Sequence, residues 1–185
     1  MTDGNVLPEE SIPANHMCQT GDTVAWATGD GDEGELTVKN IQVLTNIADL
    51  SKEDFSDYGG EIAPFADESG NLKAINGVTD IKDENGIHEG SEENQVVLVK
   101  VSCKIVNTTE ETQEYYMNTF SLKGIKELSN RVTIDYDMIP DYKNGVSEWM
   151  IYMTNAQYTT EDEREKSFFE FSLAPGECKD IDCAF

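Results

Sequence analysis

Basic residues are scarce in this chain of 185 residues, where 13 lysines and arginines stand against 37 acids and the formal net charge is −24. Arginine occurs only as Arg131 and Arg164. Nucleic-acid phosphates and anionic lipids are bound by clustered basic side chains, which this chain lacks. We therefore set aside nucleic acid and direct membrane insertion. The charge is interpreted as a solubilising surface or as an attraction for cations and basic partners.

Long hydrophobic runs are also missing. No stretch of 18 apolar residues occurs, so no segment is expected to span a membrane. Residues 1–17 have neither the basic region nor the apolar core of a signal peptide. The protein is therefore expected either to be cytosolic or to have lost a leader that preceded this chain.

Catalytic signatures are absent as well. The two histidines, His16 and His88, do not lie at the end of a predicted strand beside a serine or cysteine, as an activated nucleophile requires. Neither a Gly-x-Ser-x-Gly elbow nor a phosphate-binding loop occurs. Catalysis by a pair of carboxylates is an alternative that no motif in the sequence supports. We predict a protein that is not an enzyme and that uses no cofactor.

The four cysteines form an even set: Cys18, Cys103, Cys178 and Cys183. The spacing of the last two is not that of a metal or redox pair. Strand alternation places Cys103 and Cys183 on apolar faces and turns Cys178 the other way. The pattern predicts a Cys103–Cys183 disulfide across the core and a Cys18–Cys178 disulfide that attaches the N-terminal arm. Reduced, unpaired thiols are the alternative.

Alternating apolar residues, in contrast, recur along the chain. The clearest run covers residues 96–107, and further strands are expected at 22–27, 35–44, 114–122, 131–137, 147–154, 167–173 and 179–185. Within 35–44 the apolar phase slips by one residue at Lys39-Asn40, which predicts a β-bulge. About eight strands without crossover helices predict an all-β fold, an antiparallel β-sandwich.

One short helix is expected from about Lys52 to Tyr58, with Ser51 as its N-cap and Asp54 as the acidic half of a capping box. Residues 59–95 are rich in glycine and acids, which indicates a long acidic insertion at about 47–95. Residues 1–20 are interpreted as an N-terminal arm. Residues 21–185 are interpreted as a single β-sandwich domain that carries the insertion.

The stretch TGDGDEGE, residues 28–35, lies between two predicted strands. A calcium loop that begins at Asp30 would include Asp32, but it would place Ile41 where a bidentate acid is required. We interpret the stretch as a hairpin tip whose glycines take positive φ. Asp30 and Asp32 are candidates for weak calcium binding only. The sequon Asn107-Thr108-Thr109 is interpreted as a polar turn.

Three short motifs occur in order. Gly-Asp-Thr-Val (21–24) leads to Glu-Leu-Thr-Val (35–38), the strand 99–107 is followed by Phe-Ser-Leu (120–122), and Leu-Ala-Pro-Gly-Glu (173–177) precedes the last strand. This order resembles telokin-like, immunoglobulin-type domains of unknown function on Gram-positive cell-envelope lipoproteins, over about 21–46 and 96–185. The insertion departs from that pattern, and Cys18 follows no apolar run. The resemblance implies an immunoglobulin-like, extracellular module anchored to the envelope through a leader absent from this chain, and it supplies no catalytic residues.

We therefore predict a non-enzymatic, exported binding or scaffold module whose partner is an unknown protein or glycan at the cell surface. One alternative is a calcium-dependent adhesion module. Another is a carbohydrate- or small-molecule-binding protein that uses the acidic insertion with Trp26, Trp149 or Tyr58. The leading hypothesis expects Trp26 and Trp149 in the core, because both fall on apolar faces of predicted strands.

Overall fold

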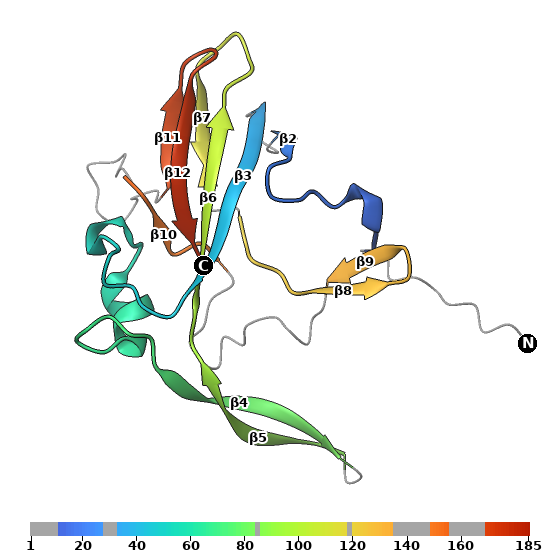
Figure 1. Ribbon diagram of the computed structural model, residues 1–185, viewed down its shortest axis with the longest axis vertical. Helices are drawn as coiled ribbons and strands as arrows, with labels where there is room; N and C mark the ends of the chain where they lie inside the picture. Colours follow the sequence, from blue (N-terminus) through green and yellow to red (C-terminus); the bar gives the residue numbers. More distant parts are fainter. Residues whose placement is uncertain (1–10, 28–32, 84–85, 118–119, 135–148, 156–168) are drawn as a thin grey trace, which may run out of the picture.

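The computed structural model describes residues 11–27, 33–83, 86–117, 120–134, 149–155 and 169–185. These residues form antiparallel sheets joined by loops and short helical turns (Figure 1). The predicted all-β sandwich is confirmed. The strands are β1 (Ile12–Pro13), β2 (Thr23–Ala27), β3 (Glu33–Leu44), β4 (Ala74–Asp83), β5 (Gly86–Gln95), β6 (Leu98–Val106), β7 (Gln113–Tyr116), β8 (Ile125–Leu128), β9 (Arg131–Ile134), β10 (Tyr152–Met153), β11 (Glu170–Leu173) and β12 (Cys178–Ala184).

The central sheet has the strand order β10-β12-β6-β3-β2, and every neighbouring pair is antiparallel. The clearest predicted strand, β6, lies in its middle. The predicted β-bulge is confirmed, because the register between β3 and β6 shifts between Val38 and Asn40. Beyond the bulge β3 stays paired with β6 as far as Leu44. β2, in contrast, pairs with β3 only over Glu33–Thr37.

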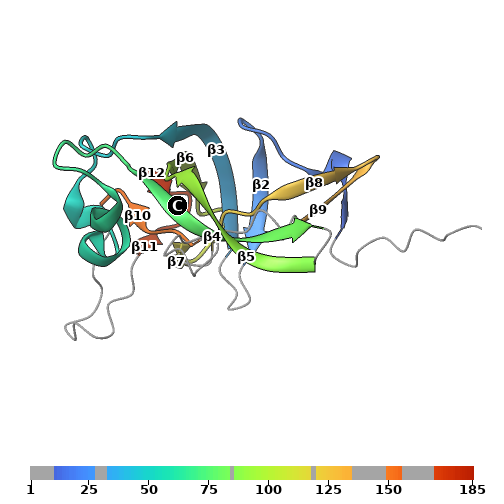
Figure 2. The same cartoon turned by 90° about the horizontal axis from the view of Figure 1, so that it is seen from below.

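The two faces of the central sheet are covered at different ends. One face carries Cys103, Ile105 and Ile181, which pack against the two-stranded sheet β7–β11. Figure 2 shows β7 and β11 on one side of β3, β6 and β12. The intervening residues point to the opposite face, since side chains alternate along a strand. There Leu98 and Ala184 pack against buried residues of the insertion: Ile47, Phe55, Ile62 and Leu72.

An aromatic stack fills the space between the central sheet and β7–β11. The ring of Tyr115 lies 5.5 Å from that of Trp26 and 5.5 Å from that of Phe171, measured between centroids. Phe120 extends the stack at 5.3 Å from Trp26. Aromatic pairs at such distances contribute about 0.5–1.5 kcal/mol each beyond the area they bury. The stack therefore fixes β7 and β11 onto the central sheet.

Gly34 is buried in β3 directly opposite Trp26, and it is not a turn glycine as predicted. A Cβ on this residue would lie 2.7 Å from the Val106 carbonyl oxygen and 2.9 Å from Tyr115 Oη. Trp26 Nε1 would be 3.0 Å away. Because real side chains do not approach that closely, glycine is required for the aromatic stack to lie on the strand.

The insertion starts with short helical turns rather than the predicted helix. These are η2 (Lys52–Asp54), η3 (Tyr58–Ile62) and η4 (Ala63–Phe65), after η1 (Ala14–His16) earlier in the chain. The Ser51 side chain makes no capping hydrogen bond, so the predicted capping box is wrong. The Asp57 carboxylate instead accepts from the Gly60 N–H at 2.9 Å, which draws Gly59-Gly60 into η3. None of the described helices is long and apolar enough to cross a membrane.

The rest of the insertion is a long hairpin, β4–β5, that extends away from the central sheet (Figure 1). Its strands pair from Ala74 opposite Gln95 to Asp83 opposite Gly86. Gly86 has φ of 116°, which favours glycine in the tight turn. The sequence did not predict this hairpin, because its strands carry many acidic and polar residues and show little apolar alternation.

The N-terminal arm is attached to the body by a third sheet, β1-β9-β8. Ile12 pairs with Val132 and Pro13 with Arg131. The Arg131 guanidinium donates to the carbonyl oxygen of the buried Ser11, and its Nε donates to Ser11 Oγ at 2.9 Å. One of the two arginines in the chain therefore ties down the arm.

Candidate binding surface

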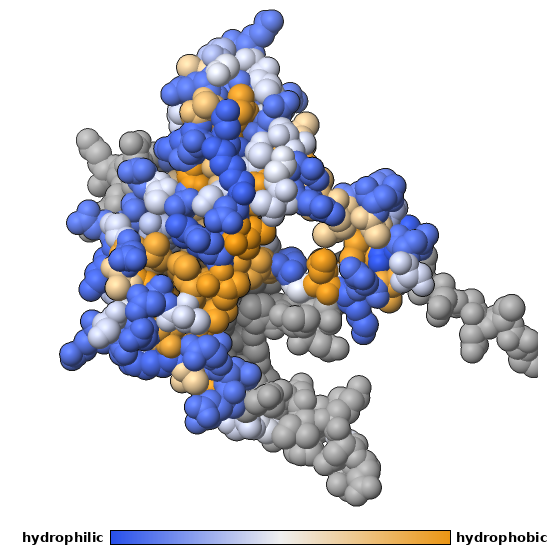
Figure 3. Space-filling model, viewed as in Figure 1, coloured by the Kyte–Doolittle hydropathy of each residue, from blue (hydrophilic) through white to orange (hydrophobic). Residues whose placement is uncertain are grey.

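Apolar side chains of β3 and β6 continue the core face of the central sheet into solvent. Ile41 lies opposite Val101, and Val43 lies opposite Val99. Ile41 is 53% exposed, Val43 is 65% exposed and Val97 is 39% exposed. We call Ile41, Val43, Val97 and Val99 the apolar strip. Figure 3 views the central sheet from the side away from β7 and β11, and hydrophobic residues lie at the surface in the middle of the molecule on that side as well.

The strip borders an open strand edge. β2 stops pairing with β3 at Thr37, and the Gly21 N–H donates to the Val38 carbonyl at 2.8 Å. From Lys39 to Leu44, no strand within the described ranges pairs with the edge of β3 that faces away from β6. In Figure 1, β2 accordingly lies beside the upper part of β3 only. An unpaired row of backbone N–H and C=O groups is a template for another strand.

Lys39 does not protect this edge. Proteins often place lysines on exposed edge strands to prevent pairing with other chains. The Lys39 ammonium instead reaches back over the sheet to Asp180 of β12, at an N–O distance of 2.5 Å. The ion pair turns the ammonium toward β12 and away from the open edge. The six residues Lys39–Leu44 include no acid and no proline. The one feature of this segment that hinders strand addition is the bulge between Val38 and Asn40, at its start.

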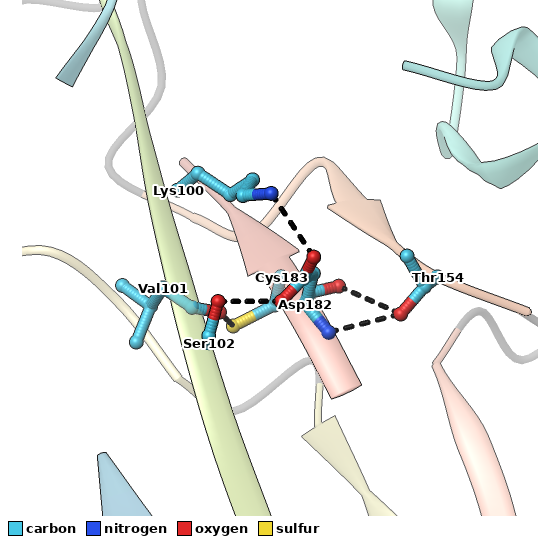
Figure 4. A network of polar contacts seen from close by, with 6 residues as sticks. All are labelled: Lys100, Val101, Ser102, Thr154, Asp182 and Cys183. Carbon is cyan, nitrogen blue, oxygen red and sulfur yellow. Dashed lines mark hydrogen bonds and ion pairs between the residues drawn. The ribbon is translucent and has the colours of Figure 1, made fainter. Parts of the chain in front are cut away.

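A polar network lies on the other face of the same sheet (Figure 4). The Asp182 carboxylate accepts from Lys100 Nζ at 3.0 Å and from Ser102 Oγ at 2.5 Å. The Asp182 N–H donates to Thr154 Oγ1 at 2.9 Å. Burial acts to raise the pKa of Asp182, but the hydrogen bonds from Ser102 and Lys100 outweigh it and the pKa is lowered. The two bonds hold this carboxylate ionised, and the network joins β6 and β12 to Thr154, the residue that follows β10.

The cysteines do not form the predicted disulfides, since all four are free thiols. Cys103 and Cys183 lie on the same face, as expected, but on neighbouring strands of one sheet rather than across the core. Cys103 faces Ile181, and Cys183 faces Val101. The two cysteines are therefore diagonal neighbours, for which Cα separations of about 7–8 Å are typical, whereas disulfides span about 4.4–6.8 Å. The Cys183 thiol donates a hydrogen bond to Cys103, and this bond together with burial raises the pKa of the Cys183 thiol.

The predicted Cys18–Cys178 disulfide is also wrong, and both thiols are exposed. The arm is held by β1 and by Arg131 instead. The calcium candidates Asp30 and Asp32 lie outside the described residues. Within the described part of the chain, no group of three or more histidine, cysteine, aspartate or glutamate side chains is arranged to hold a metal ion.

The two tryptophans differ in placement. Trp26 packs against the core, as predicted. Trp149 is 43% exposed, so the prediction that it is buried is wrong. It forms an isolated bridge with Ser121, and Lys123 Nζ lies 5.6 Å from the centre of its ring. Of the strand predicted at 147–154, residues 147–148 lie outside the described residues, and within 149–154 only Tyr152–Met153 form a strand.

Asn107 is fully buried, and the predicted polar turn is confirmed. Its Nδ2 donates to the carbonyl oxygens of Glu111 at 2.8 Å and Leu173 at 2.9 Å. Its Oδ1 accepts from the N–H and the hydroxyl of Thr109 at 2.9 and 2.8 Å. Since both amide hydrogens are bonded in the core, this side chain organises the turn and is not presented for glycosylation.

The fold and this surface define an all-β sandwich with an uncovered apolar face and an open sheet edge. No family model, no curated protein and no solved structure matches the chain. The resemblance to telokin-like domains of envelope lipoproteins therefore stays a prediction.

Proposed function

We propose that this protein is a non-enzymatic binding module of the bacterial cell envelope, and that it holds a protein partner against the apolar strip. The observation that supports this proposal is the exposure of Ile41 and Val43 on a face that is core elsewhere in the same sheet. Contiguous exposed apolar side chains are typical of interaction sites. Export and anchoring belong to the proposal through the resemblance noted in the sequence.

The chemistry of the strip favours a protein over a glycan. Sugar rings are commonly bound on the faces of exposed aromatic side chains, whereas the strip consists of isoleucine and valine. Aliphatic side chains of a protein partner complement such a surface by burial, at about 25 cal/mol per Å² of apolar area. Trp149 is the exposed aromatic that a glycan would require, but the Lys123 ammonium lies over its ring. We therefore place the protein partner first.

Binding of the purified chain to an envelope fraction tests this function. We expect saturable binding to walls and membranes prepared from Gram-positive cells. Protease treatment of the fraction should abolish binding. Muramidase treatment, which degrades the glycan, should release wall proteins that still bind the chain. Binding that survives protease and follows the glycan would contradict a protein partner. No saturable binding to any fraction would contradict an envelope function.

A further inference from the structure

We infer that the open edge of β3, residues Lys39–Leu44, binds an extended segment of a basic polypeptide as an additional strand. This inference rests on the proposed function and specifies the chemical class of its protein partner. Among the described residues no strand pairs with this edge, because β2 pairs only with Glu33–Thr37, while β6 supports β3 from the other side as far as Leu44. A stretch of six residues spans about 20 Å at roughly 3.3 Å per residue, the usual length of a strand.

The side chains of β3 define what the added strand must present. Ile41 and Val43 point to the apolar strip, and Asn40 and Gln42 point to the polar face, because side chains alternate. A complementary strand therefore alternates apolar and polar residues. Its apolar residues widen the strip, and its main chain supplies the hydrogen bonds that fix its register. Addition of a strand at an exposed edge is a common mode of peptide recognition.

The charge of the chain selects a basic partner. A net charge of −24 repels a second copy of the same chain at this edge. The same charge attracts lysine- or arginine-rich segments and accelerates their association. The edge itself has no acid between Lys39 and Leu44, and the Lys39 ammonium is paired with Asp180. Attraction therefore comes from the surrounding surface, and the edge contributes hydrogen bonds and apolar contacts.

A synthetic peptide of alternating lysine and valine, eight residues long, is the probe for this inference. We expect the peptide to bind the intact chain and to protect from hydrogen exchange those backbone amides of Lys39–Leu44 that point away from β6. Its affinity should fall as the salt concentration is raised. Alternate N-methylation blocks one edge of a strand and leaves the other free. One of the two N-methylated isomers should therefore bind as the parent does, and the other should lose at least about tenfold in affinity.

Four results would overturn the inference. Equal binding of both N-methylated isomers would show that no strand is added. Binding of the matched glutamate–valine peptide as tightly as the lysine peptide would contradict the charge argument. A concentration-dependent dimer in sedimentation, abolished by Ile41→Lys, would assign the edge to a second copy. If no peptide binds while the envelope fraction still binds through the strip, this inference fails and the proposed function stands.

Discussion

Replacing Asn107 with alanine is expected to lower the free energy of unfolding by roughly 2–4 kcal/mol. The side chain is fully buried, and it bonds the carbonyls of Glu111 and Leu173 and the Thr109 N–H. The substitution removes all three bonds, and the buried Leu173 carbonyl loses this donor, whereas the Glu111 carbonyl keeps the Thr109 hydroxyl. The bond from Asn107 to Leu173 also links the turn after β6 to β11, so the second layer loosens with its loss. Urea unfolding measures the change.

Thr108→Ala is the matched control for this prediction. Thr108 is the next residue in the turn and is exposed. Surface substitutions of this kind change stability by about 0.5 kcal/mol or less. Equal destabilisation by the two variants would mean that the turn depends on backbone propensity rather than on the buried amide.

Replacing Gly34 with alanine is expected to cost about 1–3 kcal/mol, as overpacking in a core does. The added Cβ would meet the Val106 carbonyl, Tyr115 Oη and Trp26 Nε1 at 3.0 Å or less. A backbone carbonyl in the central sheet cannot move aside without disturbing the pairing of β3 with β6. The aromatic rings must therefore shift, and near-ultraviolet circular dichroism should report the loss of the stacked Trp26–Tyr115 arrangement alongside the drop in stability.

Gly59→Ala provides the comparison at an exposed glycine. A Cβ there has Asp57 Oδ1 as its nearest neighbour, at 3.6 Å, which is ordinary contact. We expect a change of about 0.5 kcal/mol or less. If Gly34→Ala were as mild and left the near-ultraviolet spectrum intact, the close approach of the aromatic stack to β3 would be incorrect.

The sequence predicted those parts of the fold in which apolar and polar side chains alternate regularly along a strand, or in which turn residues cluster. The bulge at Lys39-Asn40 was predictable because one extra residue inverts the apolar phase, and the register shift lies there. The turn at Asn107 was predictable from its polar residues. The β4–β5 hairpin was not, because its strands have little apolar alternation. The pairing of Cys103 depends on which strand lies beside β6, and alternation alone does not specify it.

The candidate surface shows the same limit. Alternation assigned Ile41 and Val43 to an apolar face, and the structure confirms that they share a face with Val99 and Val101. It did not indicate that the covering layer of β7 and β11 leaves this part of the face exposed. Exposure depends on the length of distant strands in a second sheet. Trp149 was misplaced for the same reason, because an apolar phase implies burial only where another layer covers it.

The dissociation constant of the Ile41→Thr/Val43→Thr double variant for the envelope fraction tests the binding surface most directly. Both side chains are more than half exposed, so the variant should keep the melting temperature of the parent chain. Ile125→Thr is the control, since Ile125 is 50% exposed in the separate sheet of β8 and β9. We predict at least a tenfold weaker affinity for the double variant, or about 1.4 kcal/mol, and no change for the control. Parent-like affinity of the folded double variant would show that the apolar strip is not the binding surface.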